Sequence, residues 1–173
     1  MKSMERTLIV IKPDGPQRNL VGEIISRYER AGLKIKALKM LTATKSLVEK
    51  HYPVEKSYLV ELGKKSEKAG DKITDYEAQG RMIVTGLRDY ITSGPVVAMV
   101  AEGDNAIQRV REITGYTDPS SAKPGTIRGD LGEDSIIAAN KDKRPVKNLV
   151  HASGNPEEAQ REIGLWFVPA EVV

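Results

Sequence analysis

The chain has 173 residues, 39% hydrophobic and 29% charged, with no cysteine, a net charge of +3 and a pI near 9.0. These values are typical of a soluble globular domain, and they exclude disulfides and thiolate metal sites. No run of about 18 apolar residues is present, so we expect a cytoplasmic protein without a membrane partner. The small positive charge favours an anionic ligand, but it makes nucleic acid an unlikely partner, because stacking aromatics are also scarce.

Short apolar runs predict four strands, at 7–11, 33–38, 95–100 and 148–153. Helical spacing predicts helices at 22–30, 46–52 and 105–114, with Asp104 as the N-cap of the last, and a further helix after Asn155. This order favours an α+β, ferredoxin-like four-stranded antiparallel sheet with helices on one face.

Two segments interrupt this pattern. Residues 53–90 are rich in Lys and Glu, and their broken periodicity predicts two or three amphipathic helices with mobile joints, partial disorder being the alternative. Residues 116–144 are rich in turn signals, and only 136–139 are expected to be ordered locally.

His151 stands where the fourth strand gives way to a helix. Asn155 suits the N-cap, Pro156 the first helical position, and Glu158 completes a capping box. Such an edge holds a side chain rigidly while leaving it open to a ligand, so His151 is a candidate nucleophile. The alternative is a lone surface or core histidine.

Several cationic side chains lie next to turns. They are Lys12 before Pro13, Arg111 near a helix end with Thr117 nearby, and Arg128 in a glycine-containing loop. Lysine and arginine on rigid turns suit a polyphosphate, although each alone is more often a solvated surface charge. A Walker A loop, a zinc pattern and a serine-hydrolase elbow are all absent from the sequence.

Collinear motifs along nearly the whole chain resemble the nucleoside diphosphate kinase family, which implies one domain over 1–173. The motifs are Ile11-Lys12-Pro13-Asp14-Gly15, Gly22-Glu23-Ile24-Ile25, Ser93-Gly94-Pro95-Val96-Val97-Ala98, Thr117-Asp118-Pro119, Lys123-Pro124-Gly125-Thr126-Ile127-Arg128-Gly129-Asp130, Asn148-x-x-His151-Ala152-Ser153 and Glu162-Ile163-Gly164-Leu165-Trp166-Phe167.

The resemblance implies a reversible transfer of the γ-phosphate between nucleoside tri- and diphosphates, by a ping-pong route through a phosphohistidine. Mg²⁺ would be carried by the nucleotide, with no metal ligand from the protein. The residues that match the family's motifs are His151 as nucleophile, Glu162 on its other ring nitrogen, Ser153 supporting Glu162, Lys12 near the transferred phosphate and ribose, Asn148 on the ribose, Tyr52 and Arg128 on the γ-phosphate, and Arg111 and Thr117 on the β-phosphate. Tyr58 is the candidate for stacking on the base, and His51 is expected to be chemically silent.

The chain departs from the family pattern in three places. Gly154 stands where the family commonly has Asp, which is expected to order the metal's water shell. The segments 53–90 and 131–147 are expanded, and we expect the first to govern nucleotide access. The chain stops soon after Trp166, so a homo-oligomer, with a hexamer favoured, would lack tail contacts. The rival hypothesis is a non-catalytic nucleotide- or nucleic-acid-binding protein with the same fold.

Overall fold

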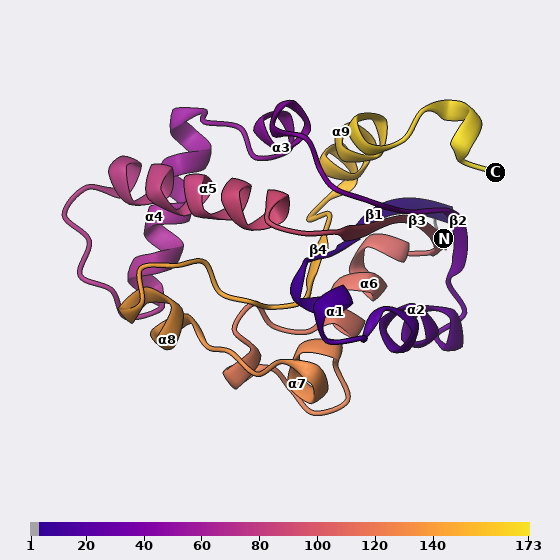
Figure 1. Cartoon of the computed structure of the whole chain (residues 1–173), viewed down its shortest axis with the longest axis horizontal. Helices are drawn as coiled ribbons and strands as arrows, with labels where there is room; N and C mark the ends of the chain where they lie inside the picture. Colours follow the sequence, from indigo (N-terminus) through magenta and orange to yellow (C-terminus); the bar gives the residue numbers. More distant parts are fainter. Residues whose placement is uncertain (1–3) are drawn as a thin grey trace.

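The computed structural model describes residues 4–173, whose strands form a four-stranded antiparallel sheet (Figure 1). The strands are β1 (Met4–Ile11), β2 (Lys34–Leu41), β3 (Val96–Asp104) and β4 (Val150–Ala152), in the order β2-β3-β1-β4. The predicted α+β sheet is therefore confirmed, although the strand that carries His151 is only three residues long.

Helices connect the strands and flank them on both sides. Those of the described chain are α1 (Asp14–Gln17), α2 (Val21–Arg30), α3 (Lys45–His51), α4 (Lys56–Lys68), α5 (Tyr76–Thr92), α6 (Ala106–Thr114), α7 (Ile127–Leu131), α8 (Ile136–Lys141) and α9 (Pro156–Trp166), with 3₁₀ turns η1 (Pro119–Ser121) and η2 (Pro169–Glu171). None of the helices in residues 4–173 is both long and apolar enough to cross a bilayer.

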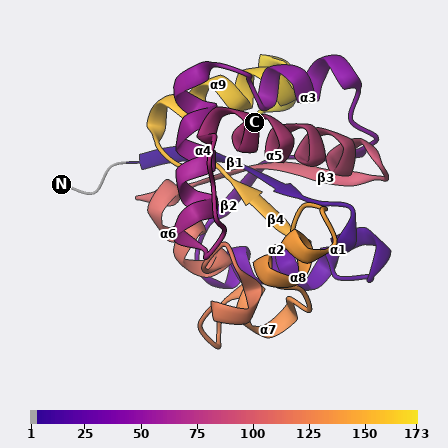
Figure 2. The ribbon, with the colours of Figure 1, turned by 90° about the vertical axis from the view of Figure 1, so that its left-hand side faces the viewer.

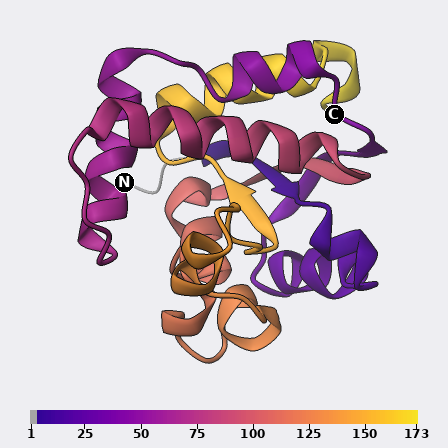
Figure 3. The ribbon, with the colours of Figure 1, turned by 60° about the vertical axis from the view of Figure 1, so that its left-hand side comes forward.

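Both faces of the sheet are covered. In β1, Leu8 and Val10 point into a core shared with α3, α5 and α9, whereas Ile9 and Ile11 point into a second core shared with α2 and α6. Figures 2 and 3 show these two helical layers with the sheet between them. The expectation of helices on one face is therefore wrong. A strand with a continuous apolar run has to be buried on both sides, and β1 and β3 are such strands.

The segment 53–90 folds into two closely packed helices, α4 and α5. A Cβ added at Gly63 would lie 2.2 Å from the carbonyl oxygen of Tyr76, and one at Gly80 would lie 2.0 Å from that of Leu59. The backbones of α4 and α5 are therefore in contact at these glycines, and a side chain at either position would prevent so close an approach.

The segment 116–144 is more ordered than its turn signals predict. The hydroxyl of Thr126 accepts from Gly129 N to cap α7, and that of Ser135 caps α8. The side chain of Asn140 on α8 donates to Asp71, in the turn that follows α4, over 2.6 Å. The two expanded segments are therefore in contact.

The start of α6 also differs from the prediction. Asn105, with a left-handed φ of 50°, occupies the N-cap in place of Asp104, and the carboxylate of Glu5 in β1 accepts from Ile107 N. A cap supplied across the sheet leaves no local sequence signal.

Candidate active site

A strained turn carries His151 into the site. Leu149, fully buried, has a φ of 68°, and Val150 N donates to Asn148 O over 2.8 Å, which closes a three-residue γ-turn. Leu149 is held at both ends, because its N–H donates to the Asp14 carboxylate and its carbonyl accepts from Lys12 N. Such strain persists only where the surroundings fix it, so the turn sets the directions of Asn148 and His151.

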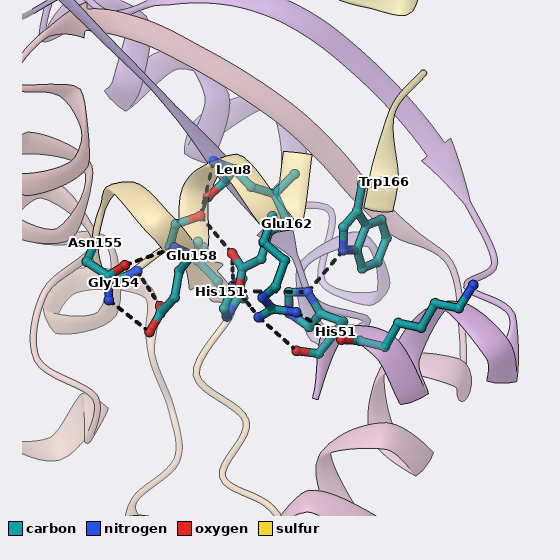
Figure 4. Close-up of polar contacts among 12 residues, drawn as sticks. Leu8, His51, His151, Gly154, Asn155, Glu158, Glu162 and Trp166 are labelled. Carbon is teal, nitrogen blue, oxygen red and sulfur yellow. Dashed lines mark hydrogen bonds and ion pairs between the residues drawn. The ribbon is translucent and has the colours of Figure 1, made fainter. Parts of the chain in front are cut away.

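His151 is anchored through one ring nitrogen (Figure 4). Its Nε2 lies 3.0 Å from Oε2 of Glu162 on α9, and the Ser153 hydroxyl donates to the same oxygen over 2.7 Å. Burial would raise the pKa of Glu162, but the hydrogen bond and charge of His151 outweigh it and lower that pKa to about 2. An ionised Glu162 accepts a hydrogen bond from Nε2–H, which leaves the lone pair on Nδ1, and this atom has no hydrogen bond within residues 4–173.

His51 is a site residue that the sequence analysis did not assign. Its buried ring stands edge-on to that of His151, with centroids 4.5 Å apart, and its Nδ1 accepts from the indole of Trp166 over 3.1 Å. Burial and the neighbouring His151 lower the pKa of His51 well below its usual value, so it stays neutral. The ring of Tyr52 lies further out, 6.2 Å from that of His151. Adjacency to Tyr52 was the only sequence signal for His51.

Lys12 and Asn148 form a second polar chain beside the histidine. Lys12 Nζ donates to Asn148 Oδ1 over 2.7 Å, and Asn148 Nδ2 donates to Thr117 O over 2.9 Å. Burial first, and then the charge of Arg128, lower the pKa of Lys12 to about 7, against the opposing charge of Asp14. An anionic ligand next to a buried lysine of this kind would stabilise the protonated, positively charged form of its side chain.

Two arginines complete the cationic side of the site. Arg128 donates to the carbonyls of Asn148, Gly115 and Val150, so it ties three segments together and keeps two N–H groups for a ligand. Burial lowers its pKa to about 10, and the charge of nearby Arg111 adds to that effect. Arg111 is exposed, and its guanidinium makes no hydrogen bond or ion pair in the described part of the chain. An unpaired guanidinium suits a phosphate.

Tyr58 faces the site from α4. It is half-buried, and burial first, then the carboxylates of Glu158 and Glu162, raise its pKa to about 12. These charges place Tyr58 across from the start of α9, where a base could stack on its ring. Tyr58 is therefore in a position that allows the predicted role without testing it.

The predicted residues divide into groups that the structure brings together. Hydrogen bonds join His151, Glu162 and Ser153, and others join Lys12, Asn148, Thr117 and Arg128. Tyr52, Tyr58 and Arg111 stand around these two groups without a side-chain bond to either, as far as residues 4–173 show.

Two histidines and a carboxylate meet at the centre of the site. The ring nitrogens of His51 and His151 and the carboxylate of Glu162 have ligand atoms within 4.8 Å of one another. One ring nitrogen of each histidine is engaged, because Glu162 accepts from His151 Nε2 and the Trp166 indole donates to His51 Nδ1. The cluster is therefore a hydrogen-bonded support for His151.

A carboxylate-anchored histidine beside a lysine and two arginines defines a site of the phosphate-transferring class. The family model for nucleoside diphosphate kinase matches residues 5–62 and 65–172. The nucleoside diphosphate kinase of Pyrobaculum aerophilum is 47% identical over 98% of both chains, and that of Archaeoglobus fulgidus is 45% identical over 98% of this chain and 91% of the relative. The chain therefore belongs to the nucleoside diphosphate kinase family of enzymes.

Solved structures agree with this assignment. The crystal structure of an NDP kinase from Pyrobaculum aerophilum is 46% identical, with a TM-score of 0.94, and the match covers 99% of this chain and 100% of that one. A transition state mimic of the Borrelia burgdorferi enzyme, with bound vanadate and ADP, is 35% identical with a TM-score of 0.83 over 98% and 90% of the two chains.

Proposed function

We propose that this enzyme reversibly transfers the γ-phosphate of a nucleoside triphosphate to a nucleoside diphosphate through a phosphohistidine on His151. The observation that carries the proposal is the hydrogen bond between His151 Nε2 and the buried carboxylate of Glu162, which leaves Nδ1 free to act as a nucleophile. An anchored neutral imidazole is a competent nucleophile near pH 7.

In the first half-reaction the lone pair of Nδ1 attacks the γ-phosphorus. A P–N bond forms, the bond to the β–γ bridging oxygen breaks, and the nucleoside diphosphate leaves with those electrons. Glu162 stabilises the positive charge that develops on the ring, and Ser153 keeps that carboxylate in place. In the second half-reaction a terminal oxygen of another nucleoside diphosphate attacks the phosphorus of the phosphohistidine. A P–O bond forms, the P–N bond breaks, and its electron pair returns to Nδ1, which restores the neutral ring.

The cations would stabilise charge that spreads over the transferred phosphoryl group. The γ-phosphate would be bound by Lys12, Tyr52 and Arg128. The β-phosphate would be bound by Arg111 and Thr117. Asn148 would bind the ribose and Tyr58 the base. The Mg²⁺ that accompanies the nucleotide as part of the substrate would neutralise further phosphate charge.

The proposal extends to assembly and location. We propose a homo-oligomer, with a hexamer favoured, in the cytoplasm. Two features support the assembly: β2 is an edge strand with Leu38 and Met40 exposed, and Tyr116 is exposed beside the loop of η1. Exposed apolar side chains on a sheet edge suit a second copy of the chain.

Steady-state kinetics test the mechanism. Varying ATP at several fixed concentrations of a nucleoside diphosphate acceptor should give parallel double-reciprocal lines, because the first product leaves before the acceptor binds. Glu162→Gln should lose about 10-fold to 100-fold in rate with little change in nucleotide affinity. Intersecting lines would refute the ping-pong route, and unchanged turnover in Glu162→Gln would refute the orienting role.

A further inference from the structure

The carboxylate of Glu158 occupies the space beside Gly154. A Cβ added at Gly154 would lie 2.7 Å from Oε2 of Glu158 and 3.5 Å from Nη1 of Arg111. Glu158 therefore places an anionic group next to the unpaired guanidinium of Arg111, at a point that a side chain on residue 154 would otherwise fill.

Glu158 is held rigidly by neutral donors. Gly154 N donates to its Oε2 over 2.8 Å, and Asn155 Nδ2 donates to its Oε1 over 3.1 Å. Its own N–H donates to Asn155 Oδ1. The predicted capping box is therefore only half formed, because the carboxylate bonds Gly154 N in place of Asn155 N. Figure 4 shows the half-buried carboxylate directed at Gly154 and Asn155.

The surroundings of Glu158 are those of the proposed nucleotide site. After burial, its charge is the main influence that raises the pKa of Tyr58 on the opposite helix, so the carboxylate faces α4 as well as Arg111. No ion pair joins Glu158 to a cation within residues 4–173. Glu158 thus adds a fixed negative charge between Tyr58 and Arg111, and this charge forms no ion pair within residues 4–173.

Other carboxylates around the site face different partners. Glu162 accepts from His151 and Ser153, and Asp118 accepts from Ser120. The buried Asp14 accepts from Leu149 N through Oδ2 and acts by its charge on Lys12, and its Oδ1 has no hydrogen-bond partner within residues 4–173. An acid that faces phosphate-binding cations without pairing to them would repel a bare polyphosphate. It suits a polyphosphate that carries Mg²⁺, since this ion keeps several waters, which donate to carboxylates.

We propose that Glu158 accepts hydrogen bonds from the water shell of the Mg²⁺ on the bound nucleotide, and so acts as a positioning residue for the metal–diphosphate unit. The inference rests on the proposed function, since it needs a nucleotide in this site. It also explains how position 154 can be glycine: the carboxylate comes from one turn into α9 instead.

Calorimetric titration of ADP into the full chain, with Mg²⁺ or with EDTA, tests this role. Glu158→Gln keeps the size and an acceptor oxygen but loses the charge. We expect it to weaken Mg·ADP binding about 10-fold, as outer-shell partners of metals do, and to leave ADP binding in EDTA unchanged or slightly tighter. Glu157→Gln, one residue away and exposed, is the matched control and should change neither.

A transfer of the carboxylate separates this role from a structural one. The double variant Gly154→Asp/Glu158→Ala should recover most of the preference for Mg·ADP over ADP, and Glu158→Ala alone should not. Equal losses with and without Mg²⁺ in Glu158→Gln, or no loss in either, would overturn the inference while wild-type binding of ADP left the proposed function intact. If the wild-type chain bound no ADP at all, the proposed function would fail first.

Discussion

At the scale of single residues, the histidine is supported from two sides. Glu162 fixes Nε2 of His151, and His51 packs edge-on against its ring. Because the Trp166 indole donates to Nδ1 of His51, the ring of His51 is itself fixed, and its low pKa keeps that ring neutral. The neutral ring of His51 thus packs against the ring of His151 and restricts its rotation.

His51→Ala should therefore lower kcat about 10-fold with little change in KM, an effect scaled on outer-shell partners of functional histidines. Steady-state kinetics would show it, with Lys50→Ala as the control, because Lys50 is adjacent but exposed. The sequence alone predicts a silent substitution, so a wild-type kcat in His51→Ala would support that simpler interpretation.

Lys12 should make nucleotide affinity depend on pH. Its pKa near 7 leaves it largely neutral above that pH in the free enzyme, and bound phosphates favour the charged form. We expect binding at pH 7.5 to take up a proton, and affinity to fall as pH rises past 7. Calorimetry in two buffers of different ionisation enthalpy measures this uptake, and Lys12→Met should abolish it while Lys123→Met should not. Equal heats in both buffers for the wild type would contradict the account.

The same shift has a consequence for stability. Because the folded pKa of Lys12 lies below its unfolded value of 10.5, the unfolded chain binds more protons between about pH 7 and 10.5. The contribution of Lys12 to the free energy of unfolding therefore rises with pH across that window.

At the scale of elements, the α4–α5 pair depends on backbone contact at glycines. Gly63→Ala would place a methyl 2.2 Å from Tyr76 O, and backbone cannot yield as a flexible side chain can. We expect a loss of about 1–3 kcal/mol in the free energy of unfolding, measured by urea denaturation, the range for overpacking. Gly164→Ala, in α9 with nothing within 4 Å, is the control and should gain about 0.5–1 kcal/mol. Equal effects of the two substitutions would contradict this packing.

The mobility of residues 53–90 stays a prediction.

The elements also show which signals the sequence carries. The apolar runs of β1 and β3 predicted strands correctly. The expectation of helices on one face was wrong because it did not take into account that such continuous runs are buried on both faces. The helix α7 was missed because it is short and contains Gly129 between turn residues. The contact of His51 with His151 joins positions a hundred residues apart, so no local pattern encodes it.

At the scale of the whole molecule, assembly is the main prediction. We expect light scattering to give a mass about six times 19.0 kDa, because closed symmetric assemblies bury exposed edges such as β2. Pro119→Ser should shift the species toward smaller masses on dilution, since Pro119 is buried in η1 and packs where Gly132 has no side chain. Pro169→Ser, at the start of the exposed η2, should have no such effect. A wild-type chain that stays monomeric at micromolar concentration would overturn the assembly.

Phosphate is proposed to pass through Nδ1 of His151, and isolation of the labelled enzyme tests this step. The wild-type chain, mixed with γ-labelled ATP and freed of nucleotide, should carry label that is stable in base and labile in acid, and a nucleoside diphosphate should remove it as the triphosphate. His151→Gln should carry none, although it still binds ADP. Label that persists in His151→Gln, or a wild-type chain that transfers phosphate without ever becoming labelled, would contradict the account.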